Sequence, residues 1–229
     1  VGVTAGDSAA KIAEAVNTKS GETGVTATAK TTATLSGLSA DGSVTLNLQG
    51  TNTTAIGITA TVLSSDLSNL ASAINEQAGN TGITATLSDD KKSITLEQSA
   101  GYDIKVSDFS HGAGAGTIAL TGSETGAQTL THGGNDSSTV GGEVSFASSA
   151  SFNVTSSVID TAGSLFGNTT ANAANVSTLQ SINTLDITSV DGSSKAIEAV
   201  DGALMQIDNM RGDLGAVQNR FESTIANLQ

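Results

Sequence analysis

The two histidines are the residues best suited to proton transfer or metal binding. His111 and His132 each lie in a glycine-rich stretch. A metal site needs further ligands at a spacing that brings them together, and a zinc protease needs two histidines four residues apart on a helix with a glutamate between them. Neither arrangement accompanies these histidines, so we expect both to be exposed loop residues without a catalytic or metal-binding role.

Other signatures of catalysis are missing as well. The sequence has no Gly-x-Ser-x-Gly elbow, and its glycine-rich runs lack the Lys-Ser/Thr of a phosphate-binding loop. Asp103 and Asp108 flank Tyr102 and Phe109 without the ligand spacing of a calcium loop, so we expect a solvated hairpin there. The absence of cysteine excludes thiolate metal sites and disulfides. The sequence therefore predicts that the protein is not an enzyme and has no cofactor.

Charge and composition narrow the classes of partner. The chain has 229 residues, with 22 acidic and 9 basic side chains and a formal net charge of −13. Such a surface repels nucleic acid and anionic membranes. No stretch approaches the ~20 apolar residues that a membrane-spanning helix needs. We expect neither nucleic acid nor a membrane as a partner. A chain of 229 residues can form one large domain or two small ones.

The clearest periodic pattern predicts one long amphipathic helix over 193–229. Its apolar residues follow one another at spacings of three or four, which is the seam that coiled-coil packing requires. Asp191, Ser193 and Ser194 can cap the first turn, whereas nothing after Leu228 caps the end, so we expect the helix to continue. The predicted helix-packing seam comprises Ile197, Val200, Leu204, Ile207, Met210, Leu214, Val217, Phe221, Ile225 and Leu228.

This seam has consequences for the whole protein. An apolar stripe of this length must be buried against other long helices, and the rest of the sequence supplies none. We therefore expect the chain to be a fragment of a bundle-forming protein that associates with itself.

An internal repeat occupies the first 106 residues. The segment 11–17 aligns with 69–75, and 23–28 aligns with 81–86 at the same offset, so no gap is needed. Each copy predicts a short helix followed by a glycine-containing turn and an alternating strand. The helix is capped by Asp7 or Ser8 in the first copy and by Ser65 or Asp66 in the second.

A hairpin is expected to complete each copy. Residues 89–92 form the turn between two strands in the second copy, and Asp41-Gly42 marks a similar turn in the first. The repeat units then span about 4–50 and 62–106. A β-rich remainder follows over 107–160, with strand candidates at 117–120, 143–146 and 151–155. A polar linker over 161–185, in which Leu165 and Phe166 are predicted anchors, leads to the helical segment 186–229.

The C-terminal segment resembles a known family. The run Leu-Gly-Ala-Val-Gln-Asn-Arg-Phe at 214–221, within 213–228, closely resembles the helix that closes the stem domain of bacterial flagellins. The segments 187–192 and 196–204 look like the beginning of that helix. The helix-plus-hairpin repeat resembles a module in the outer regions of flagellins and hook-associated proteins. The resemblance implies an α+β fold, with β-rich variable outer domains over 1–160, a linker, and the C-terminal part of a helical stem.

The same resemblance implies a function. A flagellin is the structural subunit of an extracellular filament, is exported by the flagellar type III system, and carries O-linked sugars in some cases. Its partners are other flagellin subunits, an export chaperone, the cap protein and a Toll-like innate immune receptor. We expect the polar residues of the face opposite the seam to contact neighbouring subunits or that receptor: Asp213, Gln218, Asn219, Arg220 and Glu222.

Two other classes of protein remain open. A hook-associated junction or cap protein of the flagellar axis would share the repeat and the long terminal helix. An extracellular adhesin module would explain the acidic, Ser/Thr-rich β region but not the apolar seam. The match over 214–228 favours flagellin itself.

Overall fold

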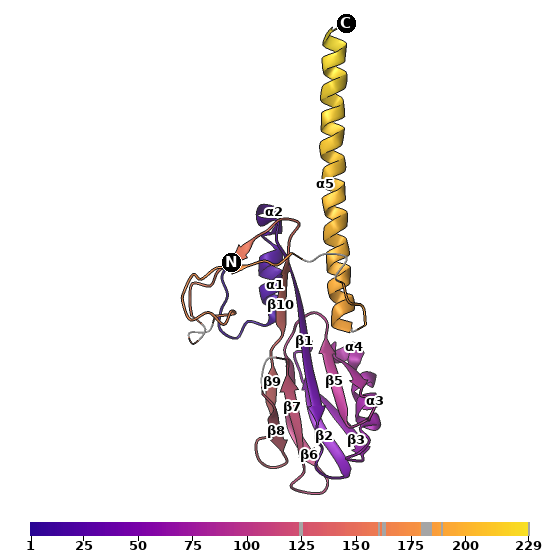
Figure 1. Ribbon diagram of the computed structural model, residues 1–229. Coiled ribbons are helices and arrows are strands. Elements are labelled where there is room, and N and C mark those ends of the chain that lie inside the picture. Colours follow the sequence, from indigo (N-terminus) through magenta and orange to yellow (C-terminus); the bar gives the residue numbers. More distant parts are fainter. Residues whose placement is uncertain (124–125, 160, 162–163, 180–184, 189, 229) are drawn as a thin grey trace. The chain divides into compact units, whose positions relative to one another are not determined.

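The computed structural model describes residues 1–123, 126–159, 161, 164–179, 185–188 and 190–228 (Figure 1). The chain divides into two compact units. Unit 1 comprises Val1–Thr18 and Ala27–Ser145, and unit 2 comprises Lys19–Thr26 and Phe146–Gln229. The α+β class expected from the sequence is confirmed, because β-sheets fill unit 1 and one long helix dominates unit 2. The domain boundaries given above remain predictions.

Two sheets form the framework of unit 1 among the described residues. One has the strand order β4-β5-β1-β7-β8, with β10 also paired to β1, and the other has the order β3-β2-β6-β9. The neighbours within these two orders run antiparallel. The strands are β1 (Thr26–Ser36), β2 (Gly42–Gln49), β3 (Ile56–Val62), β4 (Thr84–Leu87), β5 (Ser93–Gln98), β6 (Ile104–His111), β7 (Thr117–Gly122), β8 (Gln128–Thr131), β9 (Ser138–Val140) and β10 (Glu143–Ala147).

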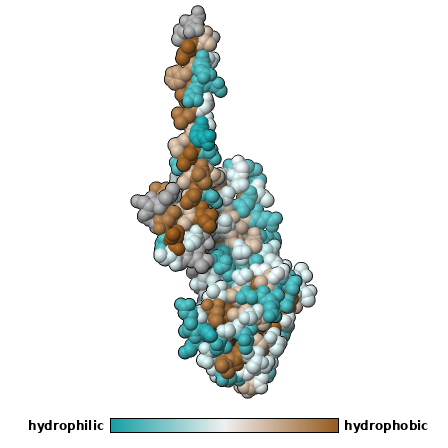
Figure 2. Space-filling view, turned by 90° about the vertical axis from the view of Figure 1, so that its right-hand side faces the viewer, coloured by the Kyte–Doolittle hydropathy of each residue, from teal (hydrophilic) through white to brown (hydrophobic). Residues whose placement is uncertain are grey.

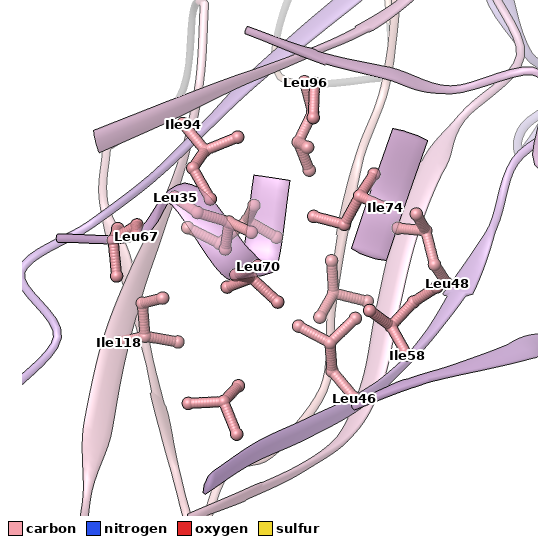
Figure 3. Close-up of a cluster of buried hydrophobic side chains, with 14 of the residues drawn as sticks. Leu35, Leu46, Leu48, Ile58, Leu67, Leu70, Ile74, Ile94, Leu96 and Ile118 are labelled. Atoms are coloured by element: carbon pink, nitrogen blue, oxygen red, sulfur yellow. The ribbon is translucent and has the colours of Figure 1, made fainter. Parts of the chain in front are cut away.

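The core of unit 1 lies between these sheets and helix α3 (Ser68–Glu76). Alternate residues of the strands are buried, as the period of two in the sequence predicts. Helix α3 packs against β3 and β4, which are the edge strands of the two sheets, and so covers one open side of the sandwich. In Figure 3 the side chains of α3 meet those of both sheets. The labelled residues of this cluster are Leu35, Leu46, Leu48, Ile58, Leu67, Leu70, Ile74, Ile94, Leu96 and Ile118.

The repeat is confirmed down to individual hydrogen bonds. Helices α1 (Ala9–Asn17) and α2 (Ser20–Thr23) correspond to α3 and α4 (Ala78–Thr81). Each second helix ends at a glycine with φ of 69°, Gly24 or Gly82, a left-handed conformation that costs glycine little. In both copies the threonine before this glycine donates to the carbonyl four residues earlier, at 3.0 Å. Similar sequences therefore produce the same local structure twice.

In each copy, a side chain accepts a backbone N–H at the beginning of the first helix, but the accepting side chains differ. In the first copy the Ser8 hydroxyl accepts the Lys11 N–H of α1 at 3.4 Å. In the second copy the Asp66 carboxylate accepts the Ser68 N–H at the beginning of α3, at 2.9 Å. Ser8 is thus the N-cap of α1, whereas Leu67 occupies the N-cap position of α3 and the Asp66 carboxylate accepts the first helical N–H from one residue before it.

The hairpin expected at Asp41-Gly42 is wrong. Strands β1 and β2 lie in different sheets, and the Asp41 carboxylate instead accepts the backbone N–H and hydroxyl of Ser64 at 2.7 and 2.8 Å. In the repeat, the beginning of β1 corresponds to β4. The strand β4 pairs with β5, whereas the beginning of β1 pairs with β10. The Thr84 hydroxyl donates to a carbonyl of β5, and the equivalent Thr26 hydroxyl donates to the Ala147 carbonyl. An alternating pattern shows which face of a strand is buried but does not specify its partner.

Unit 2 contains few strands and one long helix. Strands β11 (Asn153–Val154) and β12 (Asn175–Val176) pair antiparallel. The rings of Phe146 and Phe166 lie 6.5 Å apart within this unit. Leu165 is half exposed, and the anchoring role expected of both residues remains a prediction. Helix α5 (Val190–Leu228) has 39 residues, which corresponds to a length of about 58 Å.

Candidate functional site

Metal binding and membrane insertion find no support in the part of the chain that the structure describes. No group of three or more His, Cys, Asp or Glu side chains gathers there to hold a metal ion. Within the same residues, no helix is long and apolar enough to cross a bilayer.

His111 is buried, so the prediction of an exposed loop residue is wrong. It ends β6 with 2% of its surface exposed. Its Nδ1 accepts the Ala113 N–H and its Nε2 donates to the Ala40 carbonyl, both at 3.0 Å. A Cβ at Gly116 would lie 2.3 Å from the His111 Cγ. Gly116, one of the glycines that suggested an exposed loop, instead makes room for the ring, and both ring nitrogens are used in structural hydrogen bonds.

His132 has a structural role beside it. Its Nδ1 accepts the His111 N–H at 3.1 Å and lies 3.0 Å from the Ser110 hydroxyl oxygen. A hydrolytic Ser–His pair also needs a group that orients the imidazole and donors that stabilise an oxyanion. Among the described residues the side chain of His132 makes only the two hydrogen bonds named here. The pair therefore joins the end of strand β6 to the turn that follows β8.

Asp103 and Asp108 do not form the expected hairpin. Asp108 lies inside the continuous strand β6, and Asp103 lies directly before it. Asp108 adopts a φ of 53° where the register between β2 and β6 shifts, and its carboxylate accepts the Asn47 amide at 2.6 Å. An acidic residue tolerates this left-handed conformation better than a bulky one does. The residue thus supports a β-bulge.

The predicted helix-packing seam lies along α5. The nine seam residues whose side chains are described are between 43% and 64% exposed, and the side chain of Leu228 lies outside the described residues. Figure 2 shows apolar atoms running along this helix beside hydrophilic ones. Val200, Ile207, Leu214 and Phe221 recur every seven residues and form one continuous row of described side chains, and Leu228 continues this spacing in the sequence.

A second row completes the seam and is interrupted at its centre. Ile197, Leu204 and Ile225 share its heptad position, whereas Arg211 and Gln218 occupy the two positions between Leu204 and Ile225. Met210 and Val217 supply apolar side chains at the neighbouring position of the same turns. Over the described side chains, the seam therefore extends from Ile197 to Ile225. In its middle section the second row is polar, because Arg211 and Gln218 occupy it.

The five predicted interface residues do not share one opposite face. Gln218 lies four residues after Leu214 and three before Phe221, so it lies on the same face of the helix as the seam. Asp213 and Arg220 lie on one flank of the seam and Glu222 on the other. Only Asn219 points away from it. All five are exposed, so their predicted role in contacts with other proteins remains open to test.

Comparisons with known proteins agree with this geometry. A family model described as the bacterial flagellin C-terminal helical region matches residues 197–229, which carry the seam. The chain is 35% identical to the B-type flagellin of Pseudomonas aeruginosa over 99% of its own length and 46% of that protein. It is 31% identical to flagellin D of Vibrio cholerae over 66% of its length and 36% of that protein. The chain thus spans less than half the length of these relatives.

Proposed function

Because the chain belongs to the bacterial flagellin family, we propose that the protein is a structural subunit of a flagellar filament, assembling through α5. The observation that carries this proposal is the exposed apolar seam on the segment that matches the flagellin helical region. Unit 1 is the part presented on the filament surface. The protein acts outside the cell after export by the flagellar type III system, and it has no enzymatic activity.

Burial of the seam supplies the free energy of assembly. A large apolar side chain gains ~1.5–3 kcal/mol on full burial, so ten of them gain on the order of 15 kcal/mol before ordering costs are subtracted. The described side chains are about half exposed, so much of this gain is available only through association. Gly202, Gly212 and Gly215 weaken the helix by about 1 kcal/mol each, which makes packing more important for its order.

The partner of the seam in this proposal is an N-terminal helical arm of the same protein, outside the 229 residues. The greater length of the related flagellins supports this choice. Other flagellin subunits then pack around the pair to form the filament. The export chaperone, the cap protein and the Toll-like receptor are further proposed partners of the complete protein, with the exposed residues Asp213, Gln218, Asn219, Arg220 and Glu222 in contact with neighbours.

Two methionines offer a matched test of the seam. Met210 lies in the seam and Met205 lies outside it, and their exposed fractions are nearly equal, at 52% and 49%. In the full-length protein, Met210→Gln should reduce filament formation in a sedimentation assay, because the amide must be buried without a partner. Met205→Gln should assemble as the wild type does. Equal assembly of both variants and the wild type would contradict the proposal.

A further inference from the structure

One flank of the seam is uniformly acidic. Asp201, Asp208 and Glu222 occupy the same heptad position beside the apolar rows, and Gly215 fills the remaining place in this series. All three carboxylates are exposed. The position next to the core of a coiled coil is the one whose charges face the flank of a partner helix. We call Asp201, Asp208 and Glu222 the acidic flank.

The other flank has no such bias. The position directly beside the apolar rows on that side holds Ala203, Met210, Val217 and Thr224, none of which is charged, and the next position outward holds Ala199, Gln206, Asp213 and Arg220, whose formal charges cancel. On the acidic side, Arg211 forms an i,i+3 ion pair with Asp208 at 3.5 Å, with both side chains about three-quarters exposed. An exposed pair of this kind is weak, so it leaves the Asp208 carboxylate able to interact with a partner helix. The seam is therefore electrostatically asymmetric.

We propose that the helix which packs on the seam carries lysine or arginine along the edge that faces Asp201, Asp208 and Glu222. This inference rests on the proposed function, and the occupant is the N-terminal helical arm of the same protein. An apolar stripe alone allows a partner to slide by one heptad or to reverse its direction. A charged flank on one side only favours one orientation, because other arrangements lose the ion pairs or bring like charges together.

The proposal can be tested on the 229-residue chain with two synthetic helical peptides. Both carry the same isoleucine and leucine heptads, but one has lysine and the other glutamate at every flanking position. Each peptide repels itself to the same extent, so their self-association is matched. We expect the lysine peptide to bind about tenfold or more tightly at low ionic strength, from three attractive pairs in place of three repulsive ones. The difference should shrink in 1 M salt, where the Debye length is about 3 Å.

Substitution of the acidic flank provides the decisive comparison. In the variant D201N/D208N/E222Q the preference for the lysine peptide should largely disappear. The control variant E14Q/E76Q/D89N removes three exposed carboxylates from unit 1, so its net charge is the same. This control should keep the preference. A preference that survives in D201N/D208N/E222Q, or that is lost equally in the control, would show that overall charge and not the acidic flank is responsible.

The possible outcomes separate this inference from the proposed function. Equal binding of the two peptides to the wild-type chain would overturn the acidic-flank proposal and leave the seam as a packing surface. Failure of both peptides to bind would contradict the seam itself, and with it the basis of both proposals. Circular dichroism of each variant shows whether its helix content is unchanged, so that a loss of binding is not mistaken for a loss of structure.

Discussion

The side chain of Asn75 forms two hydrogen bonds with the backbone of Ala85. Its Nδ2 donates to the Ala85 carbonyl at 2.8 Å, and its Oδ1 accepts the Ala85 N–H at 2.7 Å. Ala85 lies in β4, an edge strand of its sheet, and is buried under α3. The carboxamide therefore satisfies the backbone groups that a further strand would otherwise pair with.

The first copy of the repeat contains the same clamp. Asn17 donates to the Ala27 carbonyl at 2.8 Å and accepts the Ala27 N–H at 2.7 Å. An amide is the side chain that can donate and accept in this way with a single peptide unit. The two asparagines thus connect each short helix to the strand that follows it.

Loss of the clamp should destabilise unit 1. Asn75→Ala leaves the N–H and carbonyl of the buried residue Ala85 without these partners, which we expect to lower the free energy of unfolding by about 2–4 kcal/mol. Urea denaturation followed by circular dichroism measures the change. Asn80→Ala is the control, because Asn80 is exposed and its side chain bonds only the Gln77 side chain in the described structure. Equal stability of the two variants would contradict the structural role of the clamp.

Gly101 should not tolerate a side chain. A Cβ there would lie 2.3 Å from the Ala29 Cβ, and its φ is +77°. We expect Gly101→Ala to lower the unfolding free energy by about 3 kcal/mol or more. Gly133 has a similar φ of +72° but nothing within 4 Å of its ideal Cβ, so Gly133→Ala should cost only about 1 kcal/mol. Similar melting temperatures for the two variants would contradict this prediction, because they would show that the surrounding residues accommodate a Cβ at position 101.

Asp66 should make unit 1 sensitive to acid. Hydrogen bonds from the Ser68 hydroxyl and N–H, and then the Lys91 ammonium, lower the pKa of Asp66 from 3.8 to about 2. Because the folded-state pKa is lower than the unfolded one, the stabilisation is present above pH 4 and is lost as the pH falls from about 4 to about 2.

We expect Asp66→Asn to be less stable than the wild type at neutral pH and to lose less stability across that pH window. Hydrogen bonds from Ser64 and Ser88 also lower the pKa values of Asp41 and Asp90, respectively. The dependence of the unfolding free energy on pH should therefore become weaker in the variant without vanishing. Denaturant titrations at pH 7, 4, 3 and 2 measure it. Parallel curves for the variant and the wild type would exclude Asp66 as a source of the acid sensitivity.

Phe221 should matter in the filament and not in the isolated chain. Its ring is 64% exposed here, so Phe221→Ala should change the stability of the 229-residue chain by less than about 0.5 kcal/mol. In the full-length assembled protein the same substitution should cost ~3–5 kcal/mol, because the ring is then part of a core. Thermal melting of both preparations gives the comparison. Unchanged melting of the assembled variant would contradict packing of the seam.

Local sequence patterns predicted the local structure well. The repeated residues around Asn17 and Asn75 gave the correct helices and turns, and the seam spacing gave helix α5. Helix periodicity and caps depend on residues within a few positions of each other, which a single sequence displays directly.

Errors arose where distant segments meet. The partnership of β1 with β10, which links Thr26 to Ala147, depends on residues 121 positions apart, and no local pattern encodes it. His111 was misplaced for a related reason, since its burial requires Gly116 to leave space and Ala40 to supply an acceptor. The prediction that Gln218 lies opposite the seam is wrong, because its spacing from Leu214 and Phe221 places it on the face of α5 that carries the seam.

Mass spectrometry of filaments sheared from the cell surface would test the central claim most directly. The tryptic peptides 196–211 and 212–220 come from the seam helix, and peptides from unit 1 would accompany them if the whole chain is in the filament. We expect these peptides to dominate the sample, which would identify the protein as the major filament subunit. Their absence, or presence only in trace amounts, would contradict that function.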